Sequence, residues 1–131
     1  MIMKSTVAIE EVNCIRDQRG VLFEPIAGDA ISAQRNVHVF VTEPGCVRGN
    51  HYHRTATEIF VVLGPALIRF REAGRLQDVA VPENACRRFN VPPGISHAIK
   101  NVGLKPMIAV SFSTVEHDRI RQETVADSLL L

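Results

Sequence analysis

The chain has 131 residues, close to the commonest size of a single domain, so it can bury one hydrophobic core and is too short for two. Fifteen basic residues stand against 14 acidic ones with no long run of either sign, which argues against nucleic acid or an anionic membrane as a partner. No stretch approaches the roughly 20 apolar residues of a membrane span, and the amino terminus lacks the apolar centre of a signal peptide. We therefore expect no membrane contact and a cytoplasmic location.

Taken in chain order, a turn at Asp17, Arg19 and Gly20 is followed by short β-branched and apolar runs separated by turn residues. The predicted strands cover residues 37–42, 59–63, 66–71, 87–91 and 107–112. In the 66–71 run apolar and polar positions alternate, which predicts one buried face and one wetter face. No helix is expected before residue 115. The pattern predicts an all-β fold, a single small antiparallel β-barrel or jelly roll over residues 1–131 with its core at about 17–115.

The carboxyl end, residues 116–131, reads differently from the strands. Its loosely spaced apolar residues allow a short helix, an extended arm or a frayed tail. The run Leu129-Leu130-Leu131 would be an aggregation risk if exposed, so one alternative is that it packs on a second subunit. Because small barrels commonly bury apolar edge strands by dimerising, we predict a homodimer.

Three cysteines, Cys14, Cys46 and Cys86, are widely spaced and contain no CxxC pair. They predict neither a disulfide framework nor a cysteine zinc site, and free thiols are the simplest interpretation. Cys46 lies five residues before His51, close enough to the motif described next to be a group on the substrate side.

The first motif is Gly45-x5-His51-x-His53-x4-Glu58. Side chains alternate along a strand, so His51 and His53 point to the same face and can bind one ion together. Glu58 follows a short turn, near the start of the next strand. The two histidines outside the motifs are not expected to bind metal. His38 lies in an apolar strand, which predicts a core or pocket residue, and His117 lies beside two acidic residues, which predicts a solvated surface group.

The second motif is Pro92-x-Gly94-x2-His97-x3-Asn101. It places a third imidazole at the start of a later strand, after a Pro-Pro-Gly turn. His51, His53, Glu58 and His97 would then hold one divalent metal ion, with open positions for water or substrate. Imidazole and carboxylate suit Zn, Ni, Fe, Mn and Co alike, and Zn is the first choice for Lewis-acid chemistry.

Together the two blocks resemble the paired motifs of the cupin superfamily, which implies a small jelly roll holding an ion on these four residues. A narrower likeness lies in residues 17–24, 48–53, 66–71 and 92–103, and it covers roughly residues 17–115. These segments look like cupins that act on nucleotide-linked deoxysugars, above all the carboxyl-terminal cupin of bifunctional capsular polysaccharide enzymes. The resemblance implies an epimerase or isomerase of polysaccharide or deoxysugar biosynthesis, with a nucleotide-linked 4-keto-6-deoxy sugar as substrate.

In the related metal-free epimerases a histidine of this block is the base and a tyrosine on a later strand is the acid. The one tyrosine here, Tyr52, alternates with His51 and His53 and so faces away from them. This favours a metal-assisted reaction. His51 and His53 are the candidate catalytic residues, as acid–base groups or as metal ligands, and Arg48 is the candidate contact for an anionic group of the substrate.

Two other classes of function stay open. One is another small-molecule metal cupin, such as a dioxygenase, a lyase or a polyketide-tailoring enzyme, because a fold does not fix a function. The other is a non-catalytic binding or sensing module. The low aromatic content, six Phe and one Tyr with no Trp, offers few stacking surfaces for a nucleotide base.

Overall fold

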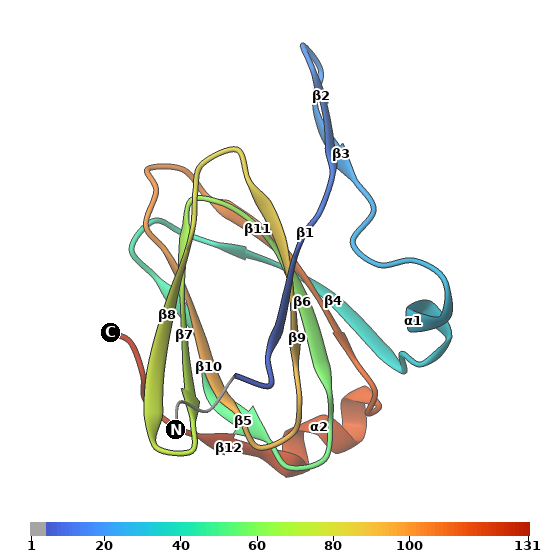
Figure 1. Ribbon diagram of the computed structural model, residues 1–131, viewed down its shortest axis with the longest axis vertical. Coiled ribbons are helices and arrows are strands. Elements are labelled where there is room, and N and C mark those ends of the chain that lie inside the picture. Colours follow the sequence, from blue (N-terminus) through green and yellow to red (C-terminus); the bar gives the residue numbers. More distant parts are fainter. Residues whose placement is uncertain (1–4) are drawn as a thin grey trace.

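The computed structural model describes residues 5–131, and these form two five-stranded antiparallel sheets that face each other (Figure 1). The first sheet contains, in spatial order, β1 (Ala8–Glu11), β9 (Cys86–Val91), β6 (Glu58–Leu63), β11 (Met107–Ser113) and β4 (Asn36–Thr42). The second contains β12 (Thr124–Ala126), β5 (Val47–His53), β10 (Ser96–Asn101), β7 (Ala66–Glu72) and β8 (Arg75–Val81). The predicted antiparallel jelly roll is confirmed, as an open sandwich of two sheets.

The core fills the space between the sheets and rests on the alternation of the inner strands. Phe60 of β6 stacks on Phe89 of β9, with ring centroids 5.0 Å apart, and on Phe70 of β7, at 6.4 Å. In β7 the residues Ala66, Ile68 and Phe70 are buried while those between them are partly exposed, as the sequence pattern predicts.

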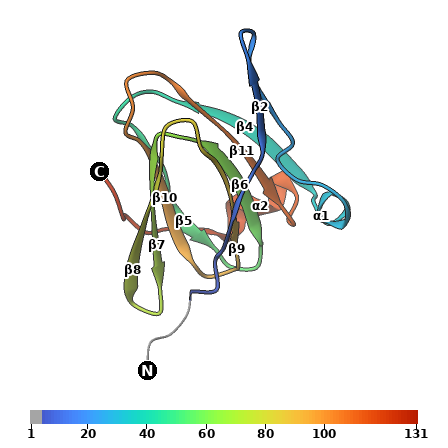
Figure 2. The same ribbon diagram turned by 45° about the horizontal axis from the view of Figure 1, so that its top comes forward.

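A separate hairpin, β2 (Cys14–Asp17) with β3 (Gly20–Phe23), projects from the sandwich in both ribbon views (Figures 1 and 2). The predicted turn at its tip is present: the Asp17 carboxylate accepts hydrogen bonds from the backbone N–H of Arg19, at 2.8 Å, and from its guanidinium. Gly20 has a φ of 134°, which a residue with a side chain rarely adopts.

Two expectations about the helices and the core need correction. One helical turn, α1 (Asp29–Ser32), precedes residue 115, and four residues are too few to show a helical period in the sequence. The sheets also extend beyond the expected core of 17–115, because β1 pairs with β9 and β12 pairs with β5. All four residues of β1 are exposed, so it carries no alternation that would reveal a strand.

The carboxyl end is an ordered part of the sandwich. It forms α2 (His117–Glu123), then β12, and then an arm along the second sheet, so the interpretation as a frayed tail is wrong and the short helix and arm are confirmed. The side chain of Asn50 bonds the backbone of Leu129 and Leu130, and Leu129 is buried within its own chain, whereas Leu131 is 97% exposed. Among the helices of residues 5–131, none is long and apolar enough to cross a membrane.

Candidate metal centre

A β-bulge in β5 sets the directions of the first motif. His51 lies opposite His97 of β10, but the next residue of β10, Ala98, lies opposite Gly49, which leaves Asn50 as an extra residue in β5. Gly49 and Asn50 both have positive φ angles, 90° and 56°. Such a bulge changes which side chains face inward, and here the residues on both sides of it share the inner face.

Four side chains converge on the inner face as the sequence predicts: His51, His53, Glu58 and His97. One ligand atom from each lies within 4.8 Å of all the others. His53, Glu58 and His97 are buried and His51 is half-buried. Three imidazole nitrogens and one carboxylate oxygen at this separation could hold a metal ion.

Glu58 lies at the centre of the cluster. Its Oε1 is 2.8 Å from Nε2 of His97 and 3.0 Å from Nε2 of His53. Its Oε2 accepts a hydrogen bond of 2.5 Å from the Ser111 hydroxyl of β11. Glu58 and Phe60 are two residues apart in β6, so alternation turns both side chains to the inner face.

In two of the histidines the outer ring nitrogen, Nδ1, which points away from the cluster, is hydrogen-bonded to an acceptor of the chain itself. Nδ1 of His97 is 3.0 Å from the carbonyl oxygen of Ile95, which can only accept, so this nitrogen carries a proton. Nδ1 of His53 is 3.0 Å from Oγ1 of Thr124, which donates its own proton to the carbonyl of Ile120 and therefore accepts from His53. Both rings thus turn Nε2 toward the centre, the arrangement that orients histidine ligands in metal sites.

The pKa values follow from burial and from the charges that face each other. Burial, followed by the neighbouring His97 and His53, lowers the pKa of His51 to about 4. Burial disfavours the charged form of His97, but the Glu58 carboxylate outweighs it and raises the pKa of that imidazole. Burial likewise opposes ionisation of Glu58, and His97 together with hydrogen bonds from its neighbours holds its pKa well below the usual value.

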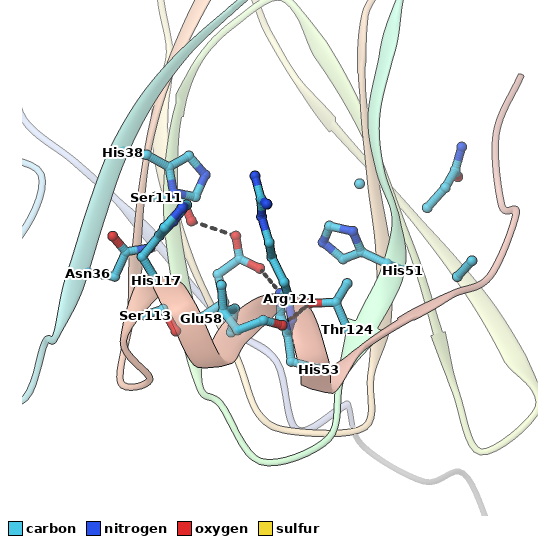
Figure 3. A pocket seen from close by; sticks show the side chains of 14 residues that line it. Asn36, His38, His51, His53, Glu58, Ser111, Ser113, His117, Arg121 and Thr124 are labelled. Carbon is cyan, nitrogen blue, oxygen red and sulfur yellow. Dashed lines mark hydrogen bonds and ion pairs between the residues drawn. The ribbon is translucent and has the colours of Figure 1, made fainter.

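A cavity of about 600 Å³ opens beside the cluster (Figure 3). One wall is the inner face of β4 and β11, with Asn36, His38 and Ser113, and the opposite wall is β5. His38 therefore faces the cavity, in agreement with its interpretation as a pocket residue. Tyr52 does not line this cavity and lies opposite Val125 of β12, as alternation predicts.

The carboxyl-terminal segment closes the cavity on a third side. His117, Ile120 and Arg121 of α2 and Thr124 of β12 line it. His117 is exposed, as predicted for a surface group, but it stands at the rim of the cavity, which the sequence did not indicate. Arg121 also lines the cavity, and no local pattern in the sequence predicts this, because its place depends on how α2 folds back across the sandwich.

Arg48 precedes the bulge in β5 and faces inward, but it does not line this cavity. It lines a smaller one, of about 280 Å³, together with His51. Its Nε donates to Oγ1 of Thr42 at 3.1 Å and its Nη2 to the carbonyl of Val41 at 3.0 Å. The centre of its guanidinium lies 5.6 Å from the ring centroid of Phe40. Arg48 is thus tied to β4, with part of its donor fork uncommitted.

Comparison with known proteins agrees with this architecture. The dTDP sugar isomerase of Desulfovibrio desulfuricans superposes with a TM-score of 0.77 at 18% identity, over 92% of this chain and 83% of that one. The capsular polysaccharide assembling protein CapF of Staphylococcus aureus superposes with a TM-score of 0.67 at 26% identity, over 90% of this chain and 34% of that one.

A relative in sequence is the UDP-2-acetamido-2,6-beta-L-arabino-hexul-4-ose reductase of Pseudomonas aeruginosa, 32% identical over 93 residues, or 69% of this chain. The match covers 25% of the length of that relative, so the chain corresponds to about a quarter of it. The family model of the polysaccharide biosynthesis C-terminal domain matches residues 15–125. The cupin resemblance is therefore confirmed, and the chain belongs to the polysaccharide biosynthesis C-terminal domain family.

Proposed function

We propose that the protein is a metal-dependent epimerase or isomerase that acts on a nucleotide-linked 4-keto-6-deoxy sugar in polysaccharide biosynthesis. The observation that carries this proposal is the convergence of three imidazoles and one carboxylate beside a cavity large enough for a hexose ring. In His53 and His97 the outer nitrogen is already bonded, so Nε2 is oriented to bind an ion.

One divalent ion would be held by His51, His53, Glu58 and His97. Zn is the first choice for a reaction without redox change, and Ni, Fe, Mn and Co suit the same donors. When bound, the ion supplies a Lewis acid for a carbonyl oxygen. Glu58 adds one negative charge to the site, and Ser111 fixes that carboxylate so that Oε1 faces the imidazoles.

Inversion beside a ketone requires a group that removes the acidified proton from the carbon. His51 and His53 were the candidate catalytic groups, but as metal ligands they are not free to take this proton. We assign proton transfer to His38, which lines both cavities beside the cluster and is outside the ligand set. Its strand partner across the ladder is Ser111, which places it next to the residue that orients Glu58.

The relatives support a substrate class. The name of the Pseudomonas protein indicates a UDP-linked hexul-4-ose, a sugar with its ketone at C4. The match covers a quarter of that protein, so no reductive step is proposed for this chain. Arg48 remains a candidate contact for a polar group of the sugar in the smaller cavity, through the part of its fork that β4 leaves uncommitted.

The test is solvent exchange. Metal-loaded protein is incubated in D₂O with a UDP-linked 4-keto-6-deoxyhexose, and deuterium at C3 and C5 is followed by NMR. We expect exchange well above the rate without protein, and a fall of roughly 10²-fold or more in His38→Asn, the typical contribution of a general base. That variant should keep its metal, which separates loss of the base from loss of the site.

Other results would redirect the assignment. Absence of exchange with every 4-keto sugar tested rejects the proposal. Oxygen uptake by the iron-loaded protein would then favour a dioxygenase, and a ligand-dependent gain in thermal stability without turnover would favour a binding module.

A further inference from the structure

One face of α2 is turned to the cavity. His117, Ile120 and Arg121 line it, and they are spaced by three and four residues, the spacing that brings side chains to the same side of a helix. Arg119 lies on the same helix, is exposed and does not line the cavity. Figure 3 shows the Arg121 side chain extending from α2 into the cavity.

The side chain of Arg121 takes part in no hydrogen bond or ion pair within residues 5–131. The other described arginine of the site, Arg48, is bonded to β4. Among the described residues that line the larger cavity, Glu58 is the only carboxylate, and the imidazoles and Ser111 already occupy it. The cavity therefore holds one guanidinium that no acceptor of the described residues occupies and that is free to bind an anion.

The helix that carries Arg121 is fixed in place. Both oxygens of the Glu123 carboxylate are bonded, one by the hydroxyl of Thr55 and one, at 2.8 Å, by the backbone N–H of Ala56. The backbone N–H of Arg54 donates to the carbonyl of Glu123 at 3.1 Å. These bonds join α2 to the turn between His53 and Glu58, so the position of Arg121 is tied to the position of the ligand cluster.

We propose that Arg121, with His117 one turn earlier, binds the diphosphate of the nucleotide-linked substrate, and that the carboxyl-terminal segment is thereby part of the substrate site. A guanidinium presents a planar fork of donors that matches two phosphate oxygens at once. The diphosphate would lie along α2 while the sugar reaches the His51 side of the cavity. This inference rests on the function proposed above, because it takes a nucleotide sugar as the ligand.

The experiment measures binding of UDP, which carries the diphosphate without the sugar, by titration calorimetry on the full chain. Wild type is compared with Arg121→Ala, with Arg119→Ala as the matched control on the same helix, and with Arg48→Ala for the second cavity. We expect the Kd for UDP to rise at least tenfold in Arg121→Ala, to change less than twofold in Arg119→Ala, and to recover in part in Arg121→Lys. The wild-type affinity should also fall with added salt.

The inference is overturned if the wild type does not bind UDP at millimolar concentration, if the Kd is unchanged in Arg121→Ala, or if Arg119→Ala loses affinity equally. A loss confined to Arg48→Ala would overturn it too, by placing the diphosphate in the smaller cavity. A melting curve for each variant excludes unfolding as the cause.

The test is separable from that of the proposed function. Binding of UDP that depends on Arg121, without deuterium exchange into any sugar, rejects the proposed reaction and keeps the diphosphate site. If Arg121→Ala catalyses deuterium exchange with unchanged KM and kcat, the proposed reaction is kept and the diphosphate site at Arg121 is rejected.

Discussion

Gly49 lies against the backbone of His97: a methyl group at Gly49 would be 2.7 Å from the carbonyl oxygen of His97 and 3.3 Å from Cα of Ala98. Neither neighbour is a flexible side-chain end, and the φ of Gly49 is already in the region that favours glycine. The close approach of β5 to β10 at this point brings His51 opposite His97, and so depends on the absence of a side chain.

Gly49→Ala should therefore separate the two strands at the cluster. We expect a loss of stability of about 1–3 kcal/mol, from backbone strain and the clash together, and a marked drop in bound metal. The control is Gly74→Ala, which has a similar positive φ of 75° but open space around the new methyl group. If both variants lose the same stability and both keep their metal, close packing at Gly49 does not shape the site.

Glu123→Gln should loosen α2. The variant keeps one acceptor oxygen but loses the charge that its two donors face, and we expect a destabilisation of about 1 kcal/mol together with weaker binding of UDP. Burial acts to raise the pKa of Glu123, but hydrogen bonds from Thr55 and Ala56 outweigh it and lower that pKa below its ordinary value of 4.5.

A carboxyl group whose pKa is lower in the folded protein than in the unfolded chain stabilises the fold at pH values above its unfolded pKa. This stabilisation is lost as the pH falls through the folded pKa. The difference in unfolding free energy between wild type and Glu123→Gln should thus be full at neutral pH and shrink below about pH 4.5. Urea denaturation at a series of pH values measures it. A difference that stays constant down to strongly acidic pH would contradict this account.

The three thiols should differ in reactivity. Cys46 is exposed and Cys86 is buried. Burial, with Cys14 beside it, raises the pKa of Cys86 to about 12, so almost no thiolate is present at neutral pH. We expect an alkylating reagent at pH 8 to modify Cys46 rapidly and Cys86 only after unfolding. Mass spectrometry of peptides follows the reaction, and Cys46→Ser should remove its rapid phase. Rapid labelling of native Cys86 would show that β9 opens.

The homodimer remains a prediction, and the fold offers a surface for it. Val37, Val39 and Val41 are exposed on the outer face of β4, the edge strand of the first sheet. Light scattering should give twice the chain mass of 14.5 kDa, and Val39→Lys should reduce that value. A single-chain mass for the wild type at micromolar concentration would reject the prediction.

Much of the fold and the candidate ligand set could be predicted from local patterns. The alternation in β7 and the spacing of His51 and His53 are strand properties, and a strand keeps them whatever surrounds it. His97 was identified by the turn before it. These features need no knowledge of distant contacts.

The remaining features depend on long-range contacts. The bulge at Asn50 is visible only in the pairing of β5 with β10. Asn50 has a left-handed backbone conformation, and its side chain bonds the backbone of Leu129 and Leu130, which lie 79 and 80 residues further along the chain. Arg48 faces inward only because of that bulge. Arg121 reaches the cavity because distant contacts hold α2 in place: Glu123 bonds the turn at Thr55 and Ala56, and β12 pairs with β5. The three residues of β12 give too short a pattern to predict that pairing.

We expect His51, His53, Glu58 and His97 to hold one divalent ion, and the reaction proposed above depends on it. The most direct test is elemental analysis by mass spectrometry of untagged protein, purified without chelator and scored as metal atoms per chain, for wild type, His53→Ala, His97→Ala and the control His117→Ala. We expect about one metal atom per chain in wild type and His117→Ala and a sharp loss of metal in the other two variants. Wild-type protein with almost no metal, or full occupancy in all four proteins, would contradict it.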